Sequence, residues 1–153
     1  MDLTKLSEKE LFDLLLNKNE QESYKVTNEV FEIIQNNDIF YPYYDSFLSM
    51  VEGRTSFIRM RGFAFCVALA KYDKDNKIEK SLPTLLSLLK DDKPTTVRVC
   101  LSSIKPLVEI KPNLKKEILP YLYTIDLSKN EYFNGISFKS SLKQVDSDDN
   151  ECY

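Results

Sequence analysis

The side chains that most often perform enzyme chemistry are scarce in this chain. It contains no histidine, which excludes Ser-His and Cys-His nucleophile pairs and histidine metal sites. The three cysteines, Cys66, Cys100 and Cys152, are scattered and form no C-x-x-C pair. We therefore expect reduced thiols and no zinc site. These observations predict a non-enzymatic protein that needs no cofactor and no metal.

Arginine is the charged residue whose spacing could form a binding site. Three of the four arginines, Arg54, Arg59 and Arg61, fall within eight residues. A guanidinium group binds carboxylates and phosphates through paired N–H donors. Arg54 also precedes a predicted helix, whose N-terminal end favours anions. An anion site near Arg54 is one interpretation, and a solvated surface that aids solubility is the other.

Aromatic residues are dense just before this arginine group, in the stretch from Phe40 to Phe47. Helical geometry turns Phe47 and one tyrosine of the Tyr43/Tyr44 pair inward, so core packing is the simpler interpretation. The remaining tyrosines could instead form an amphipathic contact surface. We hypothesise a binding surface for a partner with an acidic contact patch. Its residues are Tyr41, Tyr44, Arg54 and Arg61.

The apolar periodicity predicts the helices that position these residues. Ser7 and Glu10 have the spacing of a capping box, and Thr95 or Thr96 is expected to cap a later helix. The segment 55–71 is apolar nearly all round, which predicts the most buried helix of the protein. The predicted helices span residues 5–17, 20–36, 41–52, 55–71, 79–90, 96–110, 113–124 and 131–145.

The sequence also matches itself at a spacing of 39 residues. Tyr43–Leu69 and Leu82–Val108 share an apolar half, a polar break and an apolar-Arg pair that opens a second helical half. Such a period is typical of stacked helical hairpins. We predict an all-α fold, a short right-handed α-α solenoid of about four hairpins: 5–36, 41–71, 79–110 and 113–145. A single domain should cover 1–145, followed by a disordered acidic tail over 146–153.

The apolar-Arg pairs, Ile58-Arg59 and Val97-Arg98, resemble those of HEAT-like repeats. The third hairpin also has the expected turn residue, Asp92. The resemblance implies that Arg59 and Arg98 are structural, and that Arg98 bonds Asp92 or turn carbonyls. The chain as a whole resembles small bacterial proteins labelled SufBD, which share stretches similar to YPYYDSFLSMVEGRTSFIRMRG and DxKPxTxRxC. This resemblance implies a helical-repeat protein and carries over no activity.

The charge is unevenly distributed along the chain. Residues 1–40 carry four Lys against nine Asp and Glu, whereas residues 41–112 carry twelve Lys and Arg against eight acids. Chance and acidic ends could explain this, and so could a basic middle that attracts anions. We predict a protein-interaction or scaffold module that uses the concave face of the solenoid. The alternative is nucleic-acid binding through the basic middle hairpins, as in DNA alkylation repair-like HEAT proteins. No stretch resembles a signal peptide or a membrane span, so we expect a cytoplasmic protein that contacts no membrane.

Overall fold

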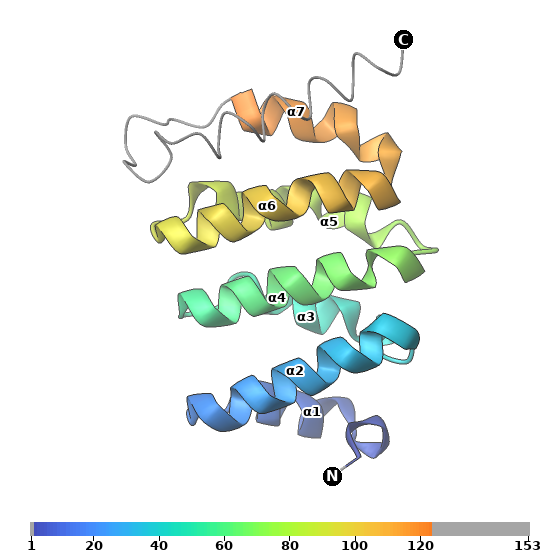
Figure 1. Ribbon diagram of the computed structural model, residues 1–153, viewed down its shortest axis with the longest axis vertical. Helices are drawn as coiled ribbons and strands as arrows, with labels where there is room; N and C mark the ends of the chain where they lie inside the picture. The colour runs from blue at the N-terminus through green and yellow to red at the C-terminus, as the bar shows by residue number, and fades with distance from the viewer. Residues whose placement is uncertain (1, 124–153) are drawn as a thin grey trace. The chain divides into compact units, whose positions relative to one another are not determined.

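The computed structural model describes residues 2–123, and all the regular structure in that range is helical (Figure 1). The prediction of an all-α fold is confirmed. The contacts divide the chain into two units, with the boundary between Ile78 and Glu79. The predicted helix 131–145 and the tail 146–153 lie outside the described residues. A single domain over 1–145 stays a prediction.

The first hairpin of the N-terminal unit consists of α1 (Glu8–Leu15) and α2 (Glu20–Asn36). The predicted capping box begins α1, with Ser7 Oγ accepting from the Glu10 N–H and Glu10 Oε1 from the Ser7 N–H. A 3-10 turn, Leu3–Lys5, precedes it. Asn19 caps α2, so each helix begins where a side chain satisfies its first N–H groups.

The second hairpin consists of α3 (Tyr44–Met50) and α4 (Ser56–Ala68). Short 3-10 helices precede α3 and follow α4, at Tyr41–Tyr43 and Leu69–Tyr72. Thr55 Oγ1 caps α4 by accepting from the Ile58 N–H at 3.2 Å. The two helices are in close contact, because a Cβ added to Gly62 would lie 2.5 Å from the Cβ of Met50. Glycine is therefore needed at this crossing.

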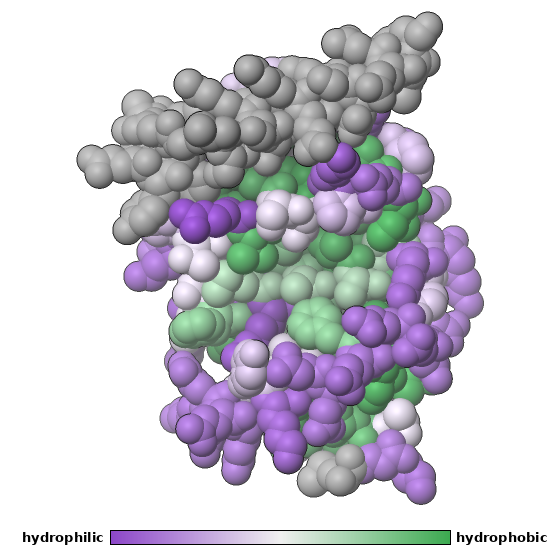
Figure 2. Space-filling view, in the orientation of Figure 1, coloured by the Kyte–Doolittle hydropathy of each residue, from purple (hydrophilic) through white to green (hydrophobic). Residues whose placement is uncertain are grey.

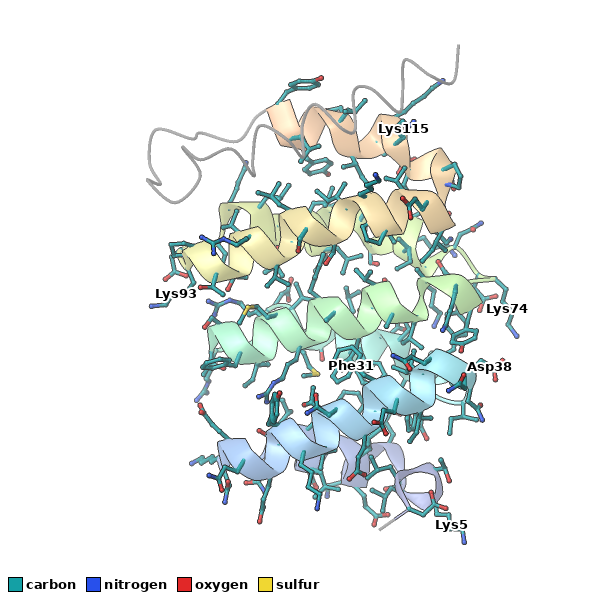
Figure 3. All side chains as sticks on the ribbon, in the orientation of Figure 1. Lys5, Phe31, Asp38, Lys74, Lys93 and Lys115 are labelled. Carbon is teal, nitrogen blue, oxygen red and sulfur yellow. The ribbon has the colours of Figure 1, made fainter. Side chains whose placement is uncertain are left out.

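An aromatic cluster joins all four helices of the N-terminal unit. Phe65 of α4 lies at its centre and has no exposed surface. Its ring centroid is 4.8 Å from that of Phe47 and 4.5 Å from that of Phe31, which Figure 3 labels between α2 and α4. Phe12 of α1 completes the cluster, with its centroid 4.9 Å from Phe47. This packing leaves α4 with only one exposed residue, Phe57. However, only four of its 13 residues are buried, against seven of the 17 in α6, so the prediction that this is the most buried helix is wrong.

The C-terminal unit contains most of α5 (Lys77–Leu86), which begins two residues before the boundary, and α6 (Pro94–Ile110) and α7 (Lys115–Tyr123). Two 3-10 helices connect them, Ser87–Lys90 and Pro112–Leu114. The 3-10 helices at the ends of α5 and α6 pack against α6 and α7 respectively. The core of the C-terminal unit is made of aliphatic side chains on one face of each helix. They include Leu82, Leu85, Leu86, Val97, Cys100, Ile104, Leu107, Leu114, Ile118 and Leu122.

Two details of the C-terminal unit differ from the sequence prediction. Neither Thr95 nor Thr96 caps α6, because the helix begins earlier, with Lys93 at the cap position and Pro94 at the first position. Proline suits that position, since its fixed φ fits a helix and its missing N–H would have no partner there. Thr96 is buried inside the first turn instead. The predicted helix 79–90 begins two residues earlier, at Lys77, and its last turn, Ser87–Lys90, is a 3-10 helix.

Candidate binding surface

The structure contradicts the two tyrosines as exposed anchors. Tyr41 is 6% exposed and Tyr44 is 1% exposed, so both belong to the core. The Tyr41 hydroxyl donates to Asp73 Oδ1 at 2.6 Å. This bond and the burial of the ring keep Tyr41 in its neutral form, since burial, followed by the Asp73 bond, raises its pKa. A partner cannot reach these rings, and the expectation of a tyrosine contact surface is wrong.

The tyrosine pair instead helps to hold the turn that leads into α5. Asp73 accepts from the Lys77 N–H at 2.9 Å and from the Ile78 N–H at 2.8 Å, which caps the start of that helix. The Lys77 ammonium lies 5.5 Å from the ring centroid of Tyr41 and 5.9 Å from that of Tyr44. Lys77 is also 3.7 Å from Asp45. Through these contacts with two rings and a carboxylate, Lys77 connects the start of α5 to α3 and the turn before it.

The two repeat-equivalent arginines differ in their surroundings. Arg59 is half-buried, and its Nη1 donates to the carbonyls of Gly53 at 3.1 Å and Arg54 at 3.3 Å. These bonds agree with a structural role, because they satisfy carbonyls of the turn between α3 and α4. Arg98 is exposed, and its guanidinium makes no hydrogen bond within residues 2–123. The expected bond from Arg98 to Asp92 or to turn carbonyls is therefore wrong for the described part of the chain.

Arg61 is the predicted binding residue that the structure places in a recess. Arg54 is exposed, whereas Arg61 is half-buried in the second turn of α4. Its Nη1 donates to Ser23 Oγ of α2 at 3.0 Å, and its guanidinium carbon lies 6.0 Å from the ring centroid of Phe57. The structure does not bring Tyr41 and Tyr44 to this recess. Of the four predicted binding residues, only Arg61 lines it.

The recess is a groove of about 230 Å³ between the α1–α2 connection and the first turns of α4. We call it the Arg61 groove. Two of its side chains are large, apolar and exposed, Leu16 at 45% and Phe57 at 52%. The residues that matter for its chemistry are Leu15, Leu16, Lys18, Phe57, Ile58 and Arg61. The groove therefore combines apolar walls with two cations.

The solvent side of α4 continues away from the groove as an apolar strip. Its members recur at helical spacing and are exposed or half-buried. Figure 2 shows a green band over α4, with the hydrophilic surface of α2 beside it. We call this strip the α4 face. It consists of Phe57, Met60, Ala64 and Ala68.

Other kinds of chemistry find little support in residues 2–123. Burial raises the pKa of Cys66 to about 12, and it also raises the pKa of Cys100, so neither thiol forms a thiolate near neutral pH. No three potential metal ligands come together in this range. Among its helices, none has the length and apolar character that crossing a membrane requires.

The sequence interpretation missed Phe57 and Leu16 as surface residues. Phe57 was assigned to a helix apolar all round, and such a helix is expected to be buried on every side. The available signal was the spacing of Phe57 and Arg61, which are four residues apart and therefore share a face. Leu16 follows the last residue of α1, where the chain turns away from the core.

Comparison with known proteins identifies no relative. No protein family, curated protein or solved structure matches this chain.

Proposed function

We propose that this protein is a non-enzymatic interaction module, in which helical hairpins stack into a short right-handed solenoid and the second helices bind a protein partner. The observation that supports it most is the α4 face. A soluble helix normally hides its large apolar side chains, yet Phe57 is half exposed and Met60, Ala64 and Ala68 lie on the same side. Contiguous apolar patches are uncommon on the surfaces of monomeric proteins, and where they occur they often mark interaction sites.

The charge around the α4 face favours an acidic partner. The stretch from Gly53 to Tyr72 contains four cations, Arg54, Arg59, Arg61 and Lys71, and no Asp or Glu. Opposite charges at the rim of an interface accelerate association and select the partner. The neighbouring helix α2 is itself acidic, with four Glu against one Lys. Arg59 and Lys71 donate to backbone carbonyls of the protein itself. The partner's carboxylates are therefore best placed at Arg54 and Arg61 and away from α2.

The proposal is tested with three variants of the full chain used as bait in pull-downs. Met60→Glu/Ala64→Glu places two negative charges on the α4 face. Lys9→Glu is the matched control, because it changes the net charge by the same amount at an exposed position of α1. Phe57→Ala removes an exposed ring and should leave the fold intact, which thermal unfolding will verify.

The expected result is a protein that wild type and Lys9→Glu capture, that Phe57→Ala captures less and that the double variant loses. Equal capture by all four proteins would contradict the proposal. Nucleic-acid binding is checked with a labelled DNA fragment, because phosphate binding weakens steeply as salt rises. A salt-dependent mobility shift with purified protein would replace the proposal by that alternative.

A further inference from the structure

We propose that the Arg61 groove binds a carboxylate that has an apolar side chain beside it, with Arg61 as the direct ligand of the carboxylate. The inference rests on the proposed function and specifies what the partner presents at this end of α4.

The guanidinium of Arg61 has donors to spare. An arginine side chain carries five N–H donors in a planar fork. Arg61 uses one of them on Ser23, and within residues 2–123 the guanidinium makes no other hydrogen bond. It is half-buried and lies against the ring of Phe57, where contact with water is reduced. A carboxylate can accept two parallel N–H bonds from such a fork, which makes it the best matched ligand.

The charges of the groove favour an anion at this point. Lys18 and Arg61 both line it, against a single acid, Glu20, which is exposed. Glu22 of α2 does not line the groove, and its Oε2 accepts from Asn17 Nδ2 at 3.0 Å. The cations therefore outnumber the acids along the groove.

The helix starts around the groove are already capped, which disfavours a phosphate as the ligand. Phosphate sites usually use free N–H groups at a helix N-terminus. Here Asn19 Oδ1 accepts from two N–H groups of α2, and Thr55 Oγ1 accepts from one of α4. A carboxylate needs only the guanidinium, whereas a phosphate would find fewer of its usual backbone donors.

The walls and size of the groove select an apolar neighbour for the carboxylate. Leu16 and Phe57 expose large apolar surfaces, and Leu15 and Ile58 lie beside them. A volume of about 230 Å³ is below the roughly 300–1,000 Å³ of pockets for drug-sized ligands or cofactors. It suits one medium-sized side chain with its carboxylate. Either a C-terminal residue or an acidic side chain next to a leucine would supply this chemistry.

The test is an NMR titration of the isotope-labelled full chain with small probes. N-acetyl-leucine carries a leucine side chain and a terminal carboxylate, and N-acetyl-leucinamide has nearly the same shape without the charge. We expect N-acetyl-leucine to shift the amide signals of residues 16–18 and 55–61, and to bind at least about ten-fold more tightly than the amide, because hydrogen bonds to charged groups are the stronger ones. N-acetyl-aspartyl-leucinamide distinguishes an internal carboxylate from a terminal one. Inorganic phosphate should not compete.

Two variants assign the effect to Arg61. Arg61→Gln should remove the preference for the carboxylate over the amide, and Arg61→Lys should retain part of it. Arg54→Gln is the control, because Arg54 is exposed and does not line the groove. Equal binding of the acid and the amide, no shift with either probe, or an unchanged preference in Arg61→Gln would overturn the inference. If the α4-face variant still loses the protein partner in that case, the interaction module stands and only the groove assignment fails.

Discussion

Replacing Gly62 by alanine should destabilise the protein, although helix propensity alone predicts the opposite. Alanine is more favourable than glycine inside a helix by about 1 kcal/mol. At Gly62 the new Cβ would lie 2.5 Å from Met50 Cβ, 2.8 Å from the Phe47 carbonyl oxygen and 2.9 Å from the Val51 nitrogen. Carbon atoms in contact are normally about 3.5–4.0 Å apart, so the first contact is too short by roughly 1 Å.

Backbone atoms of α3 cannot rotate away as a side-chain end could, so α3 and α4 must separate. Overpacking of this kind costs about 1–3 kcal/mol or more. Taking about 3 kcal/mol for a clash with backbone and subtracting the propensity gain leaves a net loss of about 2 kcal/mol. For a chain of this length, that loss lowers the Tm by roughly 4–8 °C.

The assay is thermal and urea unfolding followed by far-UV circular dichroism, with Ala64→Gly as the matched control. Ala64 lies on the solvent side of the same helix, so its replacement should cost only the propensity difference of about 1 kcal/mol. Helix propensity alone predicts that Gly62→Ala stabilises the protein and that Ala64→Gly destabilises it. The close packing of α3 against α4 predicts instead that both variants are less stable than wild type. A Gly62→Ala protein that melts at or above the wild-type temperature would refute the close packing of α3 on α4.

Three further predictions concern the core, the repeat arginines and one ion pair. Phe65→Ala should lower the free energy of unfolding by about 3–5 kcal/mol, because the ring is fully buried among other aromatics. Phe65→Asp should abolish folding, because it places a charge in the core. A Phe65→Asp protein that melts like wild type would show that α4 does not belong to the core. Arg59→Ala should lower the free energy of unfolding in urea by about 1–3 kcal/mol, because it leaves turn carbonyls unpaired. Arg98→Ala should change it by no more than about 0.5 kcal/mol, because Arg98 is exposed. Equal effects of the two substitutions would contradict the different surroundings of the two arginines. Burial raises the pKa of Glu79, but hydrogen bonds from Lys111 and other donors outweigh this effect, and the pKa lies below its usual 4.5. The ionised Glu79 carboxylate therefore stabilises the fold above pH 4.5, and this contribution is lost as the pH falls through the lower pKa of the folded state. The stability of Glu79→Gln should accordingly depend less on acid than that of wild type over that range.

The helices could be predicted because each depends on residues close in the sequence. The bounds of α2 follow from its apolar period and from Asn19, and the start of α1 follows from Ser7 and Glu10. The start of α6 was missed because a proline at the first helical position and a threonine at the cap compete within three residues, and Pro94 prevailed.

The binding surface was harder to predict because it depends on contacts distant in the sequence. Tyr41 is buried against Asp73, which is 32 residues away, and no local pattern relates the two. Arg61 reaches Ser23 across 38 residues. Helical spacing places Phe57 and Arg61 on one face, but which side of α4 stays open depends on how α2 and α3 pack against it.

The central claim, that the α4 face binds an acidic protein partner, is tested most directly by calorimetric titration of the captured partner. Wild type and Lys9→Glu should bind with the same Kd, and both affinities should fall as salt rises. Met60→Glu/Ala64→Glu, with its helical circular dichroism intact, should bind at least about ten-fold more weakly, because two buried carboxylates would lie against acidic groups. A folded double variant that binds within a factor of about two of wild type would contradict the claim.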